Sequence, residues 1–245
     1  MSSSRSRHSR RSTQQRSRHS GPRSRQPDPP GGTAMDYLVT MTTRVPEGTA
    51  EQAVDEVKAR EAAHSADLAA QGYLRRLWRP PLRPGEWRTL GLFTAGSAAE
   101  LEEVLACMPL RIWRTDEVTS LGPHANDPGL PGRAPLRIEF LITMTITMTI
   151  TVADRVPEAT VAQAEEREAT RARELAGQGH LMRLWALPAG QGESRALGLW
   201  SADDQVALQA VLQSLPLSDW MTIQTIPLSP HPSDPAGPGQ DAAVG

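Results

Sequence analysis

Apolar and polar residues follow one order of patterns twice along this chain. They alternate at residues 36–43, as in a half-buried strand, and apolar residues recur every three or four positions at about 49–71, as in an amphipathic helix. Gly72 is well placed to end that helix, because glycine readily adopts the left-handed conformation found just beyond helix ends. Residues 73–79 and 87–95 indicate two further strands.

The first copy continues with one more helix and one more strand. Ser97 and Glu100 have the spacing of a capping box, which predicts a second helix that runs through Cys107. A fourth strand is expected at residues 112–121. The order strand, helix, strand, strand, helix, strand predicts an α+β domain of the ferredoxin-like type, with an antiparallel four-stranded sheet and both helices on one face.

The second copy is an internal duplication. The sequence EAAHSADLAAQGYLRRLWR at residues 61–79 returns as EATRARELAGQGHLMRLWA at residues 168–186, and the copies align without a gap from Glu61 to His124 at an offset of 107 residues. Because this period is too long for a solenoid repeat, each copy is expected to be a complete small domain. In the second copy, helices are expected at 157–178 and up to Ser214, and later strands at 180–187, 195–201 and 219–227.

These patterns divide the chain into five predicted segments. They are a disordered tail (1–34), a first domain (35–124), a Pro/Gly-rich linker (125–138), a second domain (139–231) and a second disordered tail (232–245). The second domain opens with the alternating run ITMTITMTITV at 142–152, which we interpret as an expansion of its first strand. A sheet covered on one face only favours pairing, so the two domains are expected to pack sheet to sheet as an internal dimeric α/β barrel.

Charge and cysteine content limit the expected partners and cellular location of the chain. Residues 1–34 hold eight Arg and one Asp, a net charge of +7 in a chain of net charge −2. Such a tail can bind nucleic acid by releasing counterions, but Met35 opens a clean strand and is an alternative translation start, so nucleic acid is not an expected partner. The single Cys107 excludes an intrachain disulfide, and no apolar run is long enough to span a membrane. The expected location is the cytoplasm.

The first helix places a carboxylate among apolar side chains. Glu61 shares a helical face with Val57 and Leu68, and Glu168 takes the same position in the second copy. Burial raises the pKa of a carboxyl group towards the range of a general base. Two interpretations stay open: this carboxylate is a catalytic base, or an Arg on the facing strand neutralises it as a structural ion pair.

The histidines are weaker candidates. His64 shares the face of Glu61 and is either a core residue or a proton shuttle. His124 and His231 close their domains, either as surface loops or as caps on a neighbouring site. The sequence shows no metal-ligand spacing and no phosphate-binding loop, so neither a metal nor a cofactor is expected.

Several short motifs in both copies resemble the muconolactone Δ-isomerase family. They are the helix Glu, the glycine stop, Leu77-Trp78-Arg79, Pro-Leu after the second helix (109–110, 216–217) and a terminal L-x-x-H (121–124, 228–231). The resemblance covers about 35–127 and 139–234. It implies a cofactor-independent enzyme of the β-ketoadipate pathway of aromatic catabolism, with ferredoxin-like dimeric barrels often assembled into decamers. Such enzymes move a proton within (S)-muconolactone to give the 3-oxoadipate enol-lactone.

The resemblance also implies roles for particular residues of the first copy. Glu61 corresponds to the base or proton shuttle, Arg75 and Arg79 to partners of the substrate carboxylate and the enolate, and Trp78 to an apolar wall. Thr40 stands where the family usually has a lysine on the first strand.

The second copy matches these roles only in part. Glu168, Arg183 and Trp185 are present, but Met182 and Ala186 replace the two arginines expected to bind substrate. The loss of both would disable carboxylate binding there.

Two functions therefore remain open. The first is an isomerase acting on a small lactone carboxylate, active in the first domain and assembled as a homo-oligomer of internal pseudo-dimers. The second is a non-catalytic barrel that binds a small acid or serves in assembly. They differ in whether Glu61 faces an open cavity bearing Arg79 or a closed ion pair.

Overall fold

A computed structural model of the chain describes residues 34–129, 137–147 and 158–237, and both predicted repeats appear in it. The first half contains β1 (Met35–Thr43), α1 (Glu51–Ala70), β2 (Leu74–Arg79), β3 (Arg88–Ala95), α2 (Ala98–Ala106), the 3-10 helix η1 (Pro109–Trp113) and β4 (Arg114–Pro123). The second half contains β5 (Ile138–Thr147), α4 (Glu158–Gly177), β6 (Leu181–Ala186), β7 (Glu193–Ala202), α5 (Gln205–Gln213), η2 (Ser218–Trp220) and β8 (Met221–Pro230). The predicted order of elements is confirmed in both halves.

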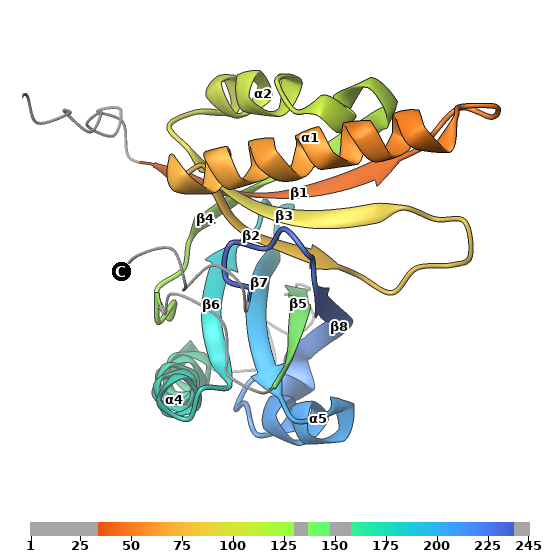
Figure 1. The fold of residues 1–245 in the computed structure, drawn as a ribbon. Helices are drawn as coiled ribbons and strands as arrows, with labels where there is room; N and C mark the ends of the chain where they lie inside the picture. The colour runs from red at the N-terminus through yellow and green to blue at the C-terminus, as the bar shows by residue number, and fades with distance from the viewer. Residues whose placement is uncertain (1–33, 130–136, 148–157, 238–245) are drawn as a thin grey trace, which may run out of the picture. The chain divides into compact units, whose positions relative to one another are not determined.

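The strands of both halves form one closed barrel in the order β1-β3-β2-β8-β5-β7-β6-β4. Each half supplies a four-stranded antiparallel sheet, and its last strand pairs with the second strand of the other half, β8 with β2 and β4 with β6. In Figure 1, α1 and α2 cover one side of the barrel, and α4 and α5 cover the opposite side. The predicted internal dimeric α/β barrel is therefore confirmed.

Three separate groups of buried side chains hold these layers together. One lies between the helices and the sheet of the first half, around Tyr37 and Phe93, and a second lies between those of the second half, around Phe140 and Trp200. The third fills the barrel and draws on both halves, with Trp78 as its largest fully buried member. Because this shared core is apolar, neither sheet can expose its inner face without a large cost in hydrophobic free energy.

Local sequence signals explain most of the element ends. Gly72 and Gly179 follow α1 and α4 with φ of 83° and 74°, which is the left-handed conformation predicted for a helix stop. The Ser97 hydroxyl accepts a hydrogen bond from the Glu100 amide (3.1 Å), as the capping box predicts. The Glu100 carboxylate instead accepts hydrogen bonds from the Gly96 amide and the Tyr73 hydroxyl.

Two predicted boundaries differ from the structure. Residues 112–113, expected to open the fourth strand, belong to η1, because Pro109 begins a short 3-10 helix there. Asp234, assigned from sequence to a disordered tail, is only 1% exposed and lies within the fold. The part of the expanded strand expected at 148–152 lies outside the described residues.

A buried ionic cluster, here called the first seam, joins β2 to the second half. Both guanidinium Nη atoms of Arg76 donate to the Glu139 carboxylate at 3.0 and 2.7 Å, and its Nε donates to Asp234 at 3.2 Å. The Trp78 indole donates to Glu139 at 2.8 Å. Since Arg76, Glu139 and Asp234 are all buried, the Arg76 guanidinium has these two carboxylate partners only when the two halves are together.

A second seam repeats the arrangement on the other side of the barrel. Arg183 donates to Asp36 at 3.0 Å and to Asp127 at 3.2 Å, and the Trp185 indole donates to Asp36 at 2.9 Å. The Arg183 side chain is 25% exposed, against 5% for its counterpart Arg76. The second seam is therefore the more solvated of the two.

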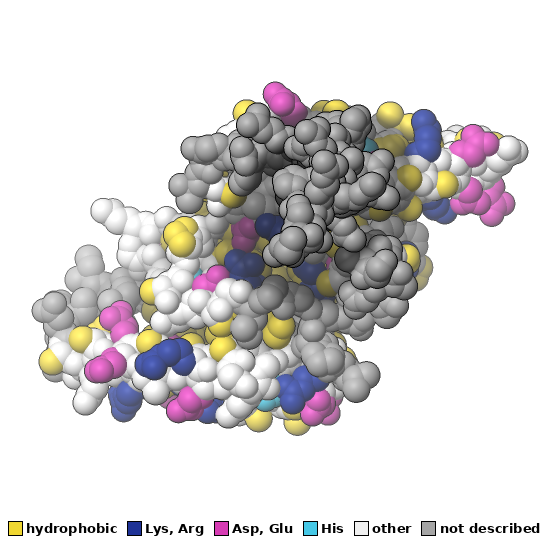
Figure 2. Space-filling view, turned by 60° about the vertical axis from the view of Figure 1, so that its left-hand side comes forward, with side chains coloured by type: hydrophobic (Ala, Val, Ile, Leu, Met, Phe, Trp, Pro, Cys, Tyr) yellow, Lys and Arg dark blue, Asp and Glu magenta, His cyan; other side chains and the backbone are white. Residues whose placement is uncertain are grey.

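The outer surface carries both signs of charge. Figure 2 shows lysine and arginine side chains interspersed with aspartate and glutamate among the described residues of that face. None of the described helices is long and apolar enough to cross a membrane.

Candidate functional site

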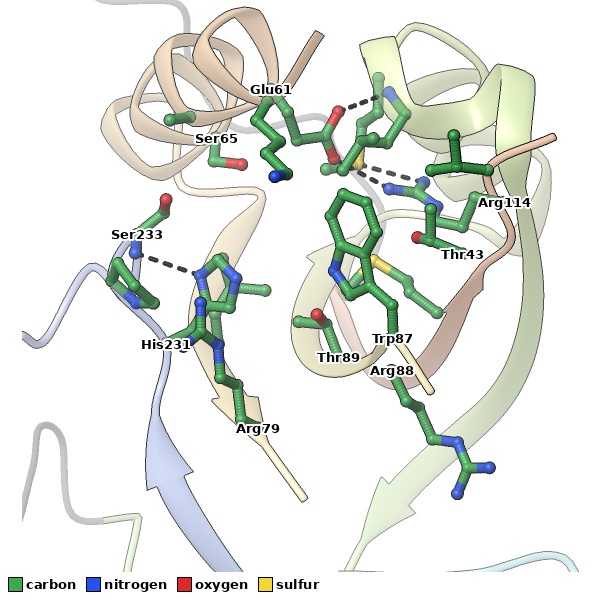
Figure 3. Close-up of a pocket in the computed structure, with 18 of the residues that line it drawn as sticks. Thr43, Glu61, Ser65, Arg79, Trp87, Arg88, Thr89, Arg114, His231 and Ser233 are labelled. Atoms are coloured by element: carbon green, nitrogen blue, oxygen red, sulfur yellow. Dashed lines mark hydrogen bonds and ion pairs between the residues drawn. The ribbon is translucent and has the colours of Figure 1, made fainter. Parts of the chain in front are cut away.

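The first half contains a cavity of about 730 Å³ between α1 and the helix-facing side of its sheet. Its wall comes from β1, β2, β3, β4, α1 and η1, and from His231, Pro232 and Ser233, which follow β8 of the other half. Cavities of ~300–1,000 Å³ are typical of small-molecule sites. Figure 3 shows Glu61 and Ser65 on one side of this first cavity, and Arg79 and His231 on the other.

Glu61 lies in the wall with both carboxylate oxygens hydrogen-bonded. Oε1 accepts from Arg114 Nη1 at 2.9 Å, and Oε2 accepts from the Leu110 amide at 2.8 Å. Arg114 also donates through Nε to Asp116 at 2.7 Å. The ion pair weighed from the sequence is therefore present, yet the Glu61 side chain keeps 12% of its surface exposed and faces the cavity that also contains Arg79.

A bulge in β2 decides which arginine reaches this cavity. Leu74 pairs with Phe93 and Arg76 with Leu92, so Arg75 is an extra residue in the ladder. After the bulge, Leu77 and Arg79 face the helix side and line the cavity. Arg79, whose sheet face the sequence left open, therefore lies on the cavity side, whereas Arg75 is exposed and donates from Nε to the Thr94 hydroxyl at 3.2 Å.

His231 closes the first cavity from the opposite half. Its Nδ1 accepts a hydrogen bond from the Ser233 amide at 3.1 Å, which leaves Nε2 as the donor of the neutral ring. Burial and the positive charge of Arg79 lower the pKa of His231 to about 4, against the smaller opposing effect of Asp234. This imidazole is therefore neutral at pH 7 and can donate a hydrogen bond without carrying a charge.

Positive charge dominates the first cavity. Its lining includes four cationic side chains, Lys58, Arg79, Arg88 and Arg114, and one carboxylate, Glu61. Lys58 also lies over the Trp87 ring, 5.5 Å from its centre, while Arg88 points away from the other labelled side chains in Figure 3. Such a balance attracts an anionic ligand.

The second half contains a cavity of about 430 Å³ at the equivalent place. His124, which precedes the linker, lies in its wall as His231 lies in the wall of the first, so the end of each half closes the cavity of the other. Its described lining is mostly apolar and contains no lysine or arginine. Burial also lowers the pKa of His124.

Glu168 occupies the position of Glu61 but has lost its cation. Its Oε2 accepts a hydrogen bond from the Leu217 amide at 3.0 Å, as Glu61 does from Leu110. Met221 stands where the first half has Arg114. Burial raises the pKa of Glu168 above its ordinary 4.5, and the Leu217 amide opposes the shift only in part.

The structure divides the predicted site residues into three groups. Glu61 and Arg79 line the first cavity together, and Glu168 lines the second. Trp78, Arg183 and Trp185, predicted as substrate-binding residues, belong instead to the two seams between the halves, and Arg75 lies on the outer surface. None of these four side chains lines either cavity among the described residues.

For two residues of the first cavity the sequence provided only partial information: it did not name Arg114, and it left His231 as either a surface loop or a cap on a neighbouring site. The sequence indicated only that some arginine on the facing strand could pair with Glu61. The replacement of Arg114 by Met221 in the second copy could have pointed to it. His231 was noted, but the sequence could not show that it closes the cavity of the other half. His64, the alternative proton shuttle, does not line the cavity, and its buried Nε2 has no partner among the described residues.

Comparisons with known proteins agree with this geometry. The family model described as muconolactone delta-isomerase matches residues 35–127 and 138–234. Muconolactone Delta-isomerase 1 of Acinetobacter lwoffii is 34% identical over 90 residues, which cover 37% of this chain and 91% of that protein. The muconolactone Delta-isomerase of Cupriavidus pinatubonensis is 33% identical over 37% of this chain and 95% of its own length.

A solved structure also shares the whole two-repeat architecture. A heme-binding protein from Thermus thermophilus aligns over 84% of this chain and 96% of its own, with a TM-score of 0.52 and 14% identity. At that identity the likeness shows the fold alone.

The fold and the paired cavities define a tandem α/β barrel, in which two ferredoxin-like repeats of one chain take the structural place of two subunits. The chain belongs to the muconolactone delta-isomerase family, with one family match in each half. The resemblance drawn from the short motifs is therefore confirmed. Its named relatives are isomerases, which supports the prediction that this chain is an isomerase.

Proposed function

We propose that the first cavity catalyses a proton shift on a small lactone carboxylate, with (S)-muconolactone as the substrate to test. The observation that carries the proposal is the placement of the Glu61 carboxylate across one cavity from Arg79 and a neutral His231. A base, a cation and an uncharged donor are what such a reaction needs. No cofactor takes part in it.

Glu61 is the proposed base. Each of its oxygens accepts one hydrogen bond and retains a second lone pair, so the carboxylate can take a proton from a substrate carbon and return it two atoms away. The electron pair of the broken C–H bond moves into the conjugated system, the C=C bond shifts, and charge develops on the lactone carbonyl oxygen. Arg114 orients the carboxylate and does not reach the reacting atoms in this proposal.

Arg79 and His231 have complementary proposed roles. The Arg79 guanidinium binds the free carboxylate of the substrate, for which a planar fork of donors is well suited. Nε2 of His231 donates to the developing enolate oxygen. A neutral donor fits this task because it stabilises the enolate without giving up its proton at pH 7.

The paired state of Glu61 favours a second function. Because its oxygens already accept from Arg114 and the Leu110 amide, the carboxylate can be a structural group in a cavity that only binds a small acid. The cationic lining supports such a binding role as well as it supports catalysis.

Turnover separates the two functions. The purified chain is mixed with (S)-muconolactone and followed by ultraviolet absorbance, and the product is examined by NMR after reaction in D₂O. An enol-lactone product supports the proton shift, and its deuterium content shows whether Glu61 returns the original proton or first exchanges it with solvent. Saturable binding of muconolactone without turnover would establish the binding role instead, and homo-oligomer formation can be measured on the same sample by light scattering.

A further inference from the structure

The second cavity has a chemical character of its own. The positions of Lys58, Arg79 and Arg114 in the first half are occupied in the second by Glu165, Ala186 and Met221. Glu165 and Glu168 line the second cavity, whereas its described residues contribute no cation to the lining. An anionic ligand there would meet carboxylates in place of guanidinium groups, and like charges in a confined site repel.

The walls of the second cavity favour apolar contact. Apolar side chains from β5, β6, α4 and the segment around η2 surround it. They include Met144, Leu181, Leu184, Trp200, Leu215 and Trp220. Burying apolar ligand surface here contributes about 25 cal/mol per Å².

The Glu168 carboxylate can orient a ligand within these walls. Glu168 has one carboxylate oxygen on the Leu217 amide, and no cation among the described residues pairs with it. The remaining lone pairs of the Glu168 carboxylate can accept a hydrogen bond from an N–H or O–H group, so a ligand needs no negative charge to bind beside it.

We infer that the second cavity is a binding site for a small organic molecule that is largely apolar, carries one hydrogen-bond donor group and is not anionic, so that it excludes carboxylates. The site is independent of the reaction proposed for the first cavity. A ligand site there gives the second repeat a function beyond supporting the barrel. Because His124 of the first half closes this cavity, the site is complete only when both repeats are folded together.

Three probes of the same shape test the ligand class. Benzamide is neutral, benzoate is anionic and benzamidine is cationic at pH 7, and each is titrated into the full chain by calorimetry with ligand-observed NMR. We expect benzamide to bind at least 10-fold more tightly to the second cavity than benzoate does, and benzoate to bind in the first cavity.

Matched substitutions assign each probe to a cavity. Ala169 lines the second cavity, and its counterpart Ala62 lines the first. Ala169→Phe should weaken benzamide binding at least 10-fold and leave benzoate unchanged, whereas Ala62→Phe should do the reverse. Thermal unfolding of both variants verifies that each remains folded.

A gain of function gives an independent measurement. Met221→Arg restores the cation that the first half has at Arg114, and it should increase the affinity of the second cavity for benzoate, measured in the Ala62→Phe background. The inference is overturned if neither benzamide nor benzamidine binds, if Ala169→Phe leaves their affinity unchanged, or if benzoate occupies the second cavity as tightly as benzamide. These outcomes are separate from muconolactone turnover, which depends on the first cavity.

Discussion

The two cavities of this barrel start from one sequence pattern and differ in a few side chains. Both have a glutamate on the long helix, a main-chain amide on that carboxylate and a histidine from the opposite half. The first pairs Glu61 with Arg114, and the second leaves Glu168 facing Met221. Duplication within one chain thus allowed one cavity to keep its cations while the other lost them.

This difference shows where the barrel depends on both copies and where it does not. The seams need both repeats, because Arg76 and Arg183 each bind carboxylates of the other half. The cavity linings carry no such requirement, apart from the histidine that each half supplies to the other. Substitutions can therefore change one cavity without loss of the barrel.

The largest expected effect comes from making the first cavity resemble the second. Arg114→Met copies Met221 and leaves the buried Glu61 without its cation, while Asp116 keeps its ion pair with Arg111. Removing one partner of a buried ion pair typically costs about 3–5 kcal/mol, so urea unfolding should show a loss of that order. The control Met221→Leu should cost less than about 1.5 kcal/mol, since it conserves volume. Equal losses from the two substitutions would argue against a special role for the Arg114 pair.

The next largest effect concerns the histidine that each half contributes to the cavity of the other. His231→Phe should lower kcat for muconolactone by about 100-fold, the usual effect of removing one donor to a developing oxyanion. His124→Phe is the matched control in the second cavity and should leave kcat unchanged. Because the pKa of His231 is about 4, the parent protein should show no histidine titration in kcat/KM between pH 5 and 8. A step near pH 6.5 that disappears in His231→Phe would contradict the neutral donor.

Replacing the arginine proposed to bind the substrate carboxylate by its counterpart in the second cavity should have a moderate effect on turnover. Arg79→Ala reproduces Ala186 and removes charge-assisted hydrogen bonds worth about 1.5–3 kcal/mol, so kcat/KM should fall by about 10- to 100-fold. Arg75→Ala, on the exposed bulge four residues earlier, is the control and should leave kinetics unchanged. The reverse result would place substrate on the outer surface of β2.

The smallest effect is a pH dependence of stability. Burial raises the folded-state pKa of Glu168 above 4.5, so between 4.5 and that raised value the folded protein binds more protons than the unfolded chain at this position. The free energy of unfolding therefore falls as pH rises through this window. Glu168→Gln removes this pH-dependent loss of stability, so the free energy of unfolding of the variant relative to the parent should increase with pH across the window. Urea titrations at several pH values check this, and a pH-independent difference would contradict it.

The sequence predicted the barrel because its signals were local and repeated. The glycine stops, the capping box and the alternating strands each indicate where a helix or strand begins or ends. The duplication indicates two similar sheets, which can bury their open faces in one shared core. The sequence could not show the bulge at Arg75, because an extra residue in a strand leaves the alternation readable on either side. One residue of slip moved Arg76 and Trp78 into the seam and left Arg75 outside.

The candidate site was predictable at Glu61 and Arg79 for different reasons. Glu61 is a charge on an apolar helical face, which is a visible anomaly. Arg79 was named through the family resemblance, and it reaches the cavity because it and Leu77 lie beyond the bulge. The identity of the partners Arg114 and His231 depends on tertiary packing, the first on a strand over 50 residues away and the second on exchange between halves.

The most direct measurement compares turnover of (S)-muconolactone by two single variants, Glu61→Gln and Glu168→Gln, with the parent protein. The account predicts that Glu61→Gln lowers kcat by about 10²- to 10⁴-fold, the usual contribution of a general base, while Glu168→Gln leaves it unchanged. Loss of turnover in Glu168→Gln with activity retained in Glu61→Gln would contradict the account, because it would place the chemistry in the cavity that has lost its cations.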